Sequence, residues 1–358
     1  MAAKHRIGIV GAGAIAGMHA MAIRDIEGAE LVAFSNGAGP RIEEFKAEYG
    51  GEYFDGFEEM VASGLCDVVT ICTPSGAHIE PTVAALEKGV HVLCEKPLEV
   101  TLERARAMID AEKQSTATLG GIFPQRFNPV VVAAQEAAAA GRMGTLAVAN
   151  AYVPWWREDS YYGPNRWQGT KKLDGGGALI NQSIHAIDTM LWLAAAAGAG
   201  NPVEVFGYAN MLCHDPEHIE VEDSAAATVR FESGAVGVIM GSTAMWPGGA
   251  MRFHLGGRDG TIEIHEQELI TWAFRDEQPG DEETRAKFGD KAGAGGAADP
   301  MAIDYSNHTR NLADFLASID EGRPSAVNGA EAWKALAVIL SIYRSAESGQ
   351  PVAVELAG

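Results

Sequence analysis

The chain has 358 residues, of which 47% are hydrophobic and 21% are charged, and its formal net charge at pH 7 is −21. This length and composition predict a globular protein of two domains, because single cores rarely grow beyond about 250–300 residues. The excess of acids argues against nucleic acid and against an anionic membrane surface as partners, since both require a basic face. The expected partner is a small molecule.

No apolar segment approaches the roughly 20 residues of a membrane-spanning helix, and the first residues lead into a strand pattern rather than a signal peptide. We therefore expect a cytoplasmic protein. The four cysteines lack the spacing of a zinc or redox motif, which predicts no disulfide and no metal. Three of them lie in apolar, strand-like segments, where buried free thiols are common.

The first third of the chain alternates short β-branched segments with helical patterns, which is typical of a parallel sheet with crossover helices. We expect strands at residues 7–10, 31–34, 67–72, 90–94 and 116–120. We expect helices at residues 15–26, 40–49, 57–63, 79–88 and 102–114. The sequence thus predicts a doubly wound Rossmann domain over residues 1–123.

Gly11-Ala12-Gly13-Ala14-Ile15-Ala16 follows the first strand and enters a helix, which is the context that a G-x-G-x-x-A dinucleotide motif requires. Gly11 permits the tight turn, Gly13 lets the backbone approach a pyrophosphate, and Ala16 lets the helix pack on the strand. The helix N-terminus offers N–H donors to the phosphates. We expect the cofactor to contact Gly11, Gly13, Ala14 and Ile15.

The end of the second strand decides between NAD and NADP, because an acid there binds the ribose 2′-hydroxyl of NAD. This chain has Ser35-Asn36-Gly37 instead, with Arg41 at the next helix start. A site without a carboxylate does not repel a 2′-phosphate, so the residues favour NADP slightly over NAD. Asn36 could equally bond the ribose of NAD, and Arg41 could be a solvated helix residue.

Two further strand ends carry polar residues at the edge where such sheets bind ligands. Thr73, Pro74 and His78 follow the strand at 67–72, although His78 could be only a first-turn helix residue. Lys96 follows the strand at 90–94 and could carry a proton, its alternative being a surface lysine. The expected cofactor contacts here are Thr73, Pro74, His78, Glu95, Lys96 and Gln125.

The second part, residues 124–358, changes to longer alternating strands and predicts an α+β domain with a large, mainly antiparallel sheet. We expect strands at residues 146–153, 203–211, 224–232, 236–243, 251–256 and 261–265. We expect helices at residues 129–140, 180–195, 302–321 and 329–348, and a loop at 276–300. A sheet with one exposed face also favours a homodimer or homotetramer.

Three glycines, Gly175-Gly176-Gly177, begin the helix at 180–195 and predict close approach of another surface. Asn181 and His185 are then expected at i and i+4 on one helix face. His185 could exchange a substrate proton near neutral pH while Asn181 positions a hydroxyl, with Asp188 orienting the imidazole. The alternative for His185 is a satisfied core histidine.

An aromatic-rich tract between residues 155 and 172 suits a pyranose ring, since apolar C–H faces pack on aromatic rings while polar side chains bond the hydroxyls. Arg157, Tyr161 and Trp167 are the expected substrate contacts, and a protomer interface is the alternative. The segment His214–His218 is expected to be a solvated loop, because Pro216 disrupts a metal-binding helix.

With the glycine motif, Thr73-Pro74, Glu95-Lys96-Pro97 and the segment from Gly175 to His185 in this order, the chain resembles the Gfo/Idh/MocA oxidoreductases over nearly its whole length. The resemblance implies a two-domain NAD(P) enzyme that oxidises a secondary alcohol of a sugar, sugar derivative or cyclitol, or reduces the ketone. It implies that Lys96 relays a proton, that Pro97 is cis, and that His185 is catalytic.

One departure from the family concerns Asn181, where inositol-dehydrogenase-like members have aspartate. An amide cannot share a proton, so either Lys96 and His185 suffice or the substrate and direction differ. His308 matches a position where several relatives present a substrate-facing group. Two alternative functions remain: a non-catalytic sugar-sensing regulator, and a glycosidase with tightly bound NAD and an internal redox cycle.

Overall fold

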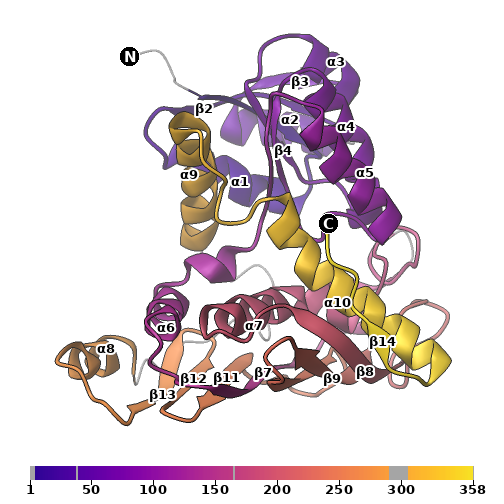
Figure 1. The fold of residues 1–358 in the computed structure, drawn as a ribbon. Helices are drawn as coiled ribbons and strands as arrows, with labels where there is room; N and C mark the ends of the chain where they lie inside the picture. The colour runs from indigo at the N-terminus through magenta and orange to yellow at the C-terminus, as the bar shows by residue number, and fades with distance from the viewer. Residues whose placement is uncertain (1–4, 38, 164–165, 290–304, 358) are drawn as a thin grey trace. The chain divides into compact units, whose positions relative to one another are not determined.

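The computed structural model describes residues 5–37, 39–163, 166–289 and 305–357, and its contacts divide the chain into two compact units (Figure 1). The first unit comprises Met1–Pro124, Asp304–Trp333 and Ala357. The second comprises Gln125–Ile303, Lys334–Leu356 and Gly358. Among the described residues, no helix is long and apolar enough to cross a membrane.

The first unit contains a six-stranded parallel sheet in the order β3-β2-β1-β4-β5-β6, as expected of a doubly wound fold. Its strands are β1 (His5–Val10), β2 (Ala29–Ser35), β3 (Glu52–Phe54), β4 (Val68–Ile71), β5 (His91–Cys94) and β6 (Leu119–Gly121). Its crossover helices are α1 (Ala14–Arg24), α2 (Pro40–Tyr49), α3 (Phe57–Ala62), α4 (Ile79–Glu87) and α5 (Leu102–Lys113). Every residue of β4 is buried, which explains its unbroken apolar pattern. In this sheet β3, a three-residue edge strand, was not predicted. In the second unit the strands Glu268–Phe274 and Val352–Ala353 were not predicted either.

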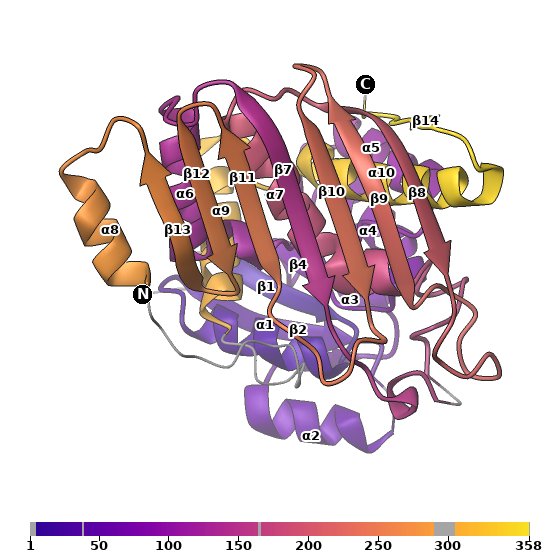
Figure 2. The same cartoon turned by 90° about the horizontal axis from the view of Figure 1, so that it is seen from below.

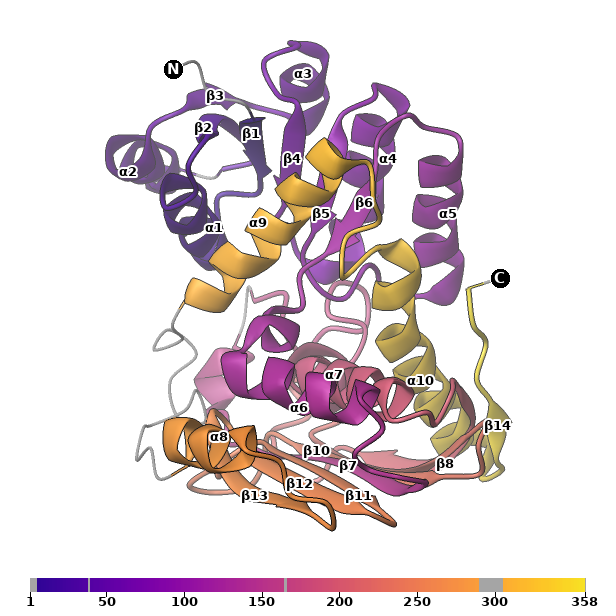
Figure 3. The same ribbon diagram turned by 60° about the vertical axis from the view of Figure 1, so that its left-hand side comes forward.

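Helix α9 (Ser306–Glu321) returns from the C-terminal part of the chain to this first sheet, beside α1 (Figure 3). Leu312, Phe315 and Leu316 on α9 are buried in one cluster with residues of β1, α1 and β5. The glycine at position 120 makes room for Phe315, because a Cβ there would lie 2.6 Å from its ring. The first compact unit therefore includes a segment outside residues 1–123. The domain boundary itself stays a prediction.

The second unit contains an eight-stranded sheet in the order β13-β12-β11-β7-β10-β9-β8-β14, and Figure 2 shows it with helices α6 and α7 behind it. Its strands are β7 (Leu146–Pro154), β8 (Pro202–Asn210), β9 (Ser224–Phe231), β10 (Val236–Ser242), β11 (Arg252–Gly257), β12 (Gly260–His265), β13 (Glu268–Phe274) and β14 (Val352–Ala353). All of its pairs are antiparallel except β7 with β10, so the predicted fold class is confirmed. Alternate residues of β9 are buried and exposed, which gives the sheet one apolar and one outward face.

The helices of the second unit are α6 (Pro129–Ala139), α7 (Ile184–Ala196), α8 (Gly280–Phe288) and α10 (Gly329–Ser348), the last of which begins in the first unit. Helices α6 and α10 lie close to the expected positions, α7 begins four residues later than expected, and α8 was not expected. The prediction of a loop at 276–300 was wrong at α8. Its sequence is polar, but Asp281 accepts hydrogen bonds from Trp272 Nε1 and from Arg142, which is 139 residues away in sequence. Residues 290–300 and the expected helix start at 302 lie outside the described residues.

A buried ion pair joins the start of this unit to α7. The Arg126 guanidinium donates to both carboxylate oxygens of Asp188 at 2.7 Å, and the two side chains are 3% and 1% exposed. The exposed pair Arg230–Glu204 at 3.2 Å has the same chemistry in solvent. Removing one partner costs more in the buried pair, because the remaining charge is shielded from water.

Arg126→Met is therefore expected to lower the free energy of unfolding by about 3–5 kcal/mol, because it removes the cation that binds both oxygens of the buried Asp188 carboxylate. Urea unfolding followed by tryptophan fluorescence measures the loss. The matched control Arg230→Met is expected to change it by less than about 1 kcal/mol. Equal losses in the two variants would contradict a structural role for the buried pair.

Candidate active site

The two glycines of the turn after β1 lie in different surroundings. Gly11 has φ +98°, donates from its N–H to Ser35 O at 2.9 Å, and leaves no room for a Cβ, which would lie 2.8 Å from Cys72 O. Gly13 is the N-cap of α1 with φ −85°, and no described atom lies within 4 Å of a Cβ built on it. Packing therefore requires Gly11 but not Gly13.

The space at Gly13 fits a dinucleotide pyrophosphate. It lies at the N-terminus of α1, whose first turn, including Ala14 and Ile15, carries no acid. Ala16 is fully buried, as the motif predicts for a helix packed on its strand. Free backbone donors, a positive helix end and room for close approach are what a phosphate group needs.

The residues expected at the ribose lie at the end of β2 and the start of α2. The Ser35 side chain is fully buried, whereas Asn36 is exposed with φ +57°, a left-handed conformation that asparagine tolerates. Arg41 is exposed in the first turn of α2. Their part in choosing NAD or NADP stays a prediction.

His78 ties two strand-end turns together. It is 1% exposed, with Nδ1 2.8 Å from Pro97 O and Nε2 2.9 Å from Thr73 O. Thr73 Oγ1 in turn donates to Ala77 O. The ring thus holds the Thr73-Pro74 turn against the turn that contains Lys96, and the Lys96–Pro97 peptide is cis, as the resemblance implies.

Glu95, next to Lys96 in the chain, forms a buried charged pair with His19. The sequence analysis singled out Glu95 but not His19. The Lys96 side chain is half-buried and its backbone N–H donates to Glu95 Oε2 at 3.2 Å. Glu95 Oε1 accepts from His19 Nε2 at 2.9 Å, and His19 Nδ1 lies 2.6 Å from Thr70 Oγ1. His19 and Glu95 are 2% and 7% exposed. A histidine on the buried side of the glycine-motif helix, near Ala16 and Ala20, was the available signal, since a buried ring needs partners.

Electrostatic interactions favour the charged forms of both His19 and Glu95. Burial lowers the pKa of His19, but Cys72 and Glu95 more than offset this and raise the pKa to about 10. Burial raises the pKa of Glu95, but the hydrogen bond and charge of His19, with the charges of His308 and Lys96, lower it to about 2. His308, 7% exposed on α9, has its ring centroid 6.1 Å from that of His19. The first unit thus brings Glu95, Lys96 and His308 together around His19.

The three glycines of the second unit admit a close neighbour, as predicted. A Cβ at Gly177 would lie 2.1 Å from Glu222 O, and one at Gly176 would lie 2.2 Å from Tyr343 Oη. The buried Glu222 carboxylate accepts from the N–H groups of Gly177 and Leu179 at 2.8 Å. It therefore fixes the start of the helix that carries Asn181 and His185.

That helix does not begin as the α-helix that the sequence analysis assumed. Ala178–Ser183 forms a π-helical turn, and α7 begins at Ile184. The expectation that Asn181 and His185 share an α-helical face was therefore wrong, because a π turn is wider than 3.6 residues. Asn181 is buried in the π turn, and His185 is half-buried in the first turn of α7.

Two of the expected sugar contacts belong to one buried polar chain. Arg157 donates to Gln182 Oε1 through Nη2 at 2.8 Å, and Gln182 Nε2 donates to Tyr161 Oη at 3.0 Å. Trp167 is half-buried nearby in sequence, and its carbonyl accepts from Thr170 Oγ1. Gln125, expected at the cofactor, lies just before α6, where its carbonyl accepts from the Asn128 N–H.

The expectation of a solvated loop at His214–His218 was wrong for His214. Its side chain is 2% exposed, its Nε2 lies 2.9 Å from Arg157 O, and its Nδ1 lies 3.4 Å from the Asp223 carboxylate. His218 is exposed, as expected. The buried His214 ring therefore holds the backbone at Arg157.

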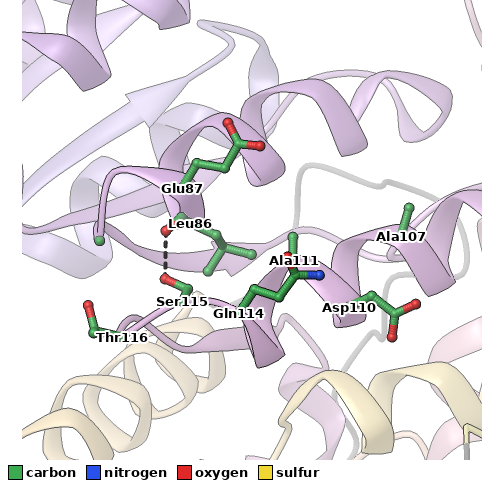
Figure 4. A pocket seen from close by; sticks show the side chains of 9 residues that line it. Leu86, Glu87, Ala107, Asp110, Ala111, Gln114, Ser115 and Thr116 are labelled. Atoms are coloured by element: carbon green, nitrogen blue, oxygen red, sulfur yellow. Dashed lines mark hydrogen bonds between the residues drawn. The ribbon is translucent and has the colours of Figure 1, made fainter.

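A hollow between the ends of α4 and α5 differs in its lining from the candidate active site (Figure 4). Its charged lining residues are Glu87 and Asp110, and none of the expected site residues lines it. In a doubly wound fold the carboxyl ends of α4 and α5 lie at the amino ends of the strands, whereas ligands bind at the carboxyl ends. We assign it no part in the candidate active site.

Comparison with known proteins agrees with this geometry in both units. The model of the oxidoreductase family with an NAD-binding Rossmann fold (GFO_IDH_MocA) matches residues 5–121, and that of the GFO/IDH/MocA C-terminal domain matches residues 131–263. The chain belongs to the GFO/IDH/MocA oxidoreductase family. The resemblance inferred from the motifs is therefore confirmed.

Members of the GFO/IDH/MocA family resemble this chain over nearly its whole length. It is 27% identical to the D-glucoside 3-dehydrogenase of Escherichia coli (strain K12), covering 97% of both chains. It is also 27% identical to the 1,5-anhydro-D-fructose reductase of Ensifer adhaerens, covering 98% of this chain and 99% of that one. The WlbA dehydrogenase from Bordetella pertussis, solved in complex with NADH and UDP-GlcNAcA, is similar with a TM-score of 0.88 and 27% identity over 99% of each chain.

The glycine turn yields a paired prediction. Gly13→Ala is expected to fold normally but to weaken dinucleotide binding by about tenfold or more, because the methyl group occupies the phosphate space. Gly11→Ala is expected to lower stability by about 1–3 kcal/mol through its positive φ and its contact with Cys72 O. Thermal unfolding and calorimetric titration with NAD and NADP separate the two effects. Unchanged nucleotide affinity in a folded Gly13→Ala variant would contradict the assignment of the cradle.

The His19–Glu95 pair predicts a pH-dependent stability difference between wild type and His19→Gln. The folded-state pKa of His19, about 10, exceeds its unfolded value of about 6.5. Its stabilisation is therefore complete below pH 6.5 and is lost as the pH rises towards 10. The variant is expected to be less stable than wild type by the largest margin near pH 6, with the margin shrinking towards pH 10. Urea unfolding across that range measures it, and a margin independent of pH would contradict a charged His19.

Proposed function

We propose that this protein is an NAD(P)-dependent oxidoreductase that moves a hydride between nicotinamide and a carbon bearing a secondary alcohol of a carbohydrate. The substrate class is a sugar, glycoside or cyclitol, or the corresponding ketone in the reducing direction. The observation that carries the proposal is the open phosphate cradle at Gly13, on the same sheet edge as Lys96. The named activities of the relatives, a glucoside dehydrogenase and an anhydrofructose reductase, support it.

The cofactor supplies hydride chemistry at its nicotinamide ring, and the first unit supplies most of the proposed contacts. The amides of Gly13, Ala14 and Ile15 offer donors to the pyrophosphate, with Gly11 shaping the turn. The remaining proposed contacts are Ser35, Asn36, Arg41, Thr73, Pro74, His78, Glu95, Lys96 and Gln125. With no acid on the ribose side and Arg41 exposed there, the site is proposed to accept NADP as well as NAD.

Proton transfer is assigned to Lys96 and His185. In the oxidising direction the substrate hydroxyl loses its proton, and a neutral Lys96 Nζ or a His185 ring nitrogen accepts it. The His19–Glu95 pair fixes the turn that carries Lys96, since Glu95 binds the Lys96 backbone N–H. Proposed substrate contacts are Lys96 and His308 in the first unit, and Arg157, Tyr161, Trp167, Asn181 and His185 in the second.

The finer assignments on partners and location are also proposals. The outward sheet face of the second unit exposes Tyr208, Val236 and Ile270 by 62%, 49% and 45%. We propose that a second copy of this chain covers this face, giving a homodimer or homotetramer. The small carbohydrate is the proposed ligand, with neither nucleic acid nor membrane as partner and with a cytoplasmic location.

Lys96→Met is expected to reduce turnover by about 10²–10⁴-fold while keeping nucleotide affinity, because it removes the proton carrier and leaves the cradle intact. Methyl glucosides, glucose and myo-inositol are offered with NAD and with NADP, following the absorbance of reduced nicotinamide; 1,5-anhydro-D-fructose is offered with the reduced cofactors. Lys113→Met, an exposed helix lysine, is the control.

Near-normal turnover of Lys96→Met would exclude its role. A wild type that is silent with every probe in both directions would instead favour the non-catalytic regulator. Cleavage of a glycoside without net reduction of added cofactor would indicate the NAD-dependent glycosidase.

A further inference from the structure

Four buried side chains of the second unit form one continuous hydrogen-bonded chain. Arg157 donates to Gln182 Oε1, Gln182 Nε2 donates to Asn181 Oδ1 at 3.0 Å, and Asn181 Nδ2 donates to Asp174 Oδ1 at 2.6 Å. Their exposed fractions are 5%, 8%, 8% and 0% in the same order. A cation and a carboxylate are thus linked through two side-chain amides.

The two charged ends dictate the orientation of both amides. A guanidinium can only donate, so the Gln182 oxygen must face Arg157. A carboxylate can only accept, so the Asn181 nitrogen must face Asp174. The remaining nitrogen of Gln182 and oxygen of Asn181 then meet each other, as observed. The order of donors and acceptors follows from the ends of the chain alone.

We propose that Asp174 is a positioning residue of the active site, which sets the orientation of Asn181 in the π turn before His185. This inference rests on the proposed function, because it assumes that Asn181 acts on the substrate. The chain lacks a carboxylate at position 181, and Asp174 provides one that is a single hydrogen bond away. Sequence reasoning gave Asp174 no role, since it lies seven residues upstream in a glycine-rich segment.

Both oxygens of Asp174 accept hydrogen bonds, so an asparagine at this position cannot replace the carboxylate fully. Asp174 Oδ2 accepts from the Gly169 N–H at 2.8 Å while Oδ1 accepts from Asn181. An asparagine at position 174 has one oxygen for these two donors, so one bond is lost and the Asn181 nitrogen loses the carboxylate that orients it. Asn181→Asp places two carboxylates in contact, which disfavours the charged form of both.

The exchange variant Asp174→Asn/Asn181→Asp restores the donor–acceptor order of this chain. The new carboxylate at position 181 accepts from Gln182 and from the amide introduced at 174, whose oxygen still accepts from Gly169. If Asp174 only stabilised the 169–174 segment, moving the carboxylate to position 181 would not restore turnover. Recovery by exchange therefore separates positioning from folding.

The experiment measures kcat and KM for the best probe of the screen, together with nucleotide affinity and the thermal midpoint. Each single variant is expected to lower kcat by about ten- to a hundredfold with nucleotide affinity unchanged. The exchange is expected to return kcat to within about threefold of wild type. Asp215→Asn, an exposed carboxylate, is the control and should match wild type.

A folded Asp174→Asn variant with wild-type kcat, or an exchange variant no better than the product of the single losses, would overturn the positioning role alone. A wild type that turns over none of the probes would overturn the proposed function and the positioning role with it. The thermal midpoints of the wild type, the two single variants and the exchange variant then still report whether Asp174 and Asn181 are energetically coupled.

Discussion

Charges removed from water must find partners inside the protein, and this requirement fixes the candidate site residues of both units. An isolated buried ion is so unfavourable that it is paired or neutralised. In the first unit the pairing is His19 with Glu95, whose carboxylate also holds the Lys96 backbone. In the second unit Arg157 and Asp174 are linked through two amides, and Arg126 binds Asp188. The proposed site residues therefore lie on hydrogen-bonded supports that form without a ligand.

Preorganisation of this kind has a chemical purpose. Hydride transfer needs the donor and acceptor atoms in one narrow geometry, and a small misplacement lowers the rate strongly. A lysine on a flexible loop would sample many positions, whereas His78, Pro97 and the Glu95 carboxylate hold the turn that carries Lys96. The same logic applies to Asn181, whose amide could rotate freely without its neighbours. The open space at Gly13 is the complementary feature, because the cradle leaves room for the phosphates.

Much of the fold could be predicted because its signals are local. The glycine motif stands between a strand and a helix, and β-branched segments alternate with helical periodicity through the parallel sheet. The features that were missed depend on contacts far apart in sequence. Helix α8 is held by Arg142, which lies 139 residues from Asp281. Glu95 is separated from His19 by 76 residues, so no window around Lys96 reveals the charge beneath it.

The site residues follow the same division. Motif positions such as Gly11, Gly13 and Lys96 could be proposed from the sequence because each lies in a recognisable local motif. The π turn at Ala178–Ser183 could not, since its width depends on Glu222 and Tyr343 packing against the glycines. That turn changes how Asn181 and His185 relate, and it places Asn181 beside Asp174 rather than in a regular helix.

Transfer of deuterium from a C-deuterated sugar to the nicotinamide ring tests the proposed hydride transfer most directly. Perdeuterated glucose and its methyl glucosides are incubated with the protein and oxidised cofactor, and the reduced cofactor is examined by NMR. Hydride transfer from the sugar is expected to give deuterium at C4 of the nicotinamide and a keto sugar as the product. Reduced cofactor without deuterium, or a converted sugar with no label in the cofactor, would contradict it.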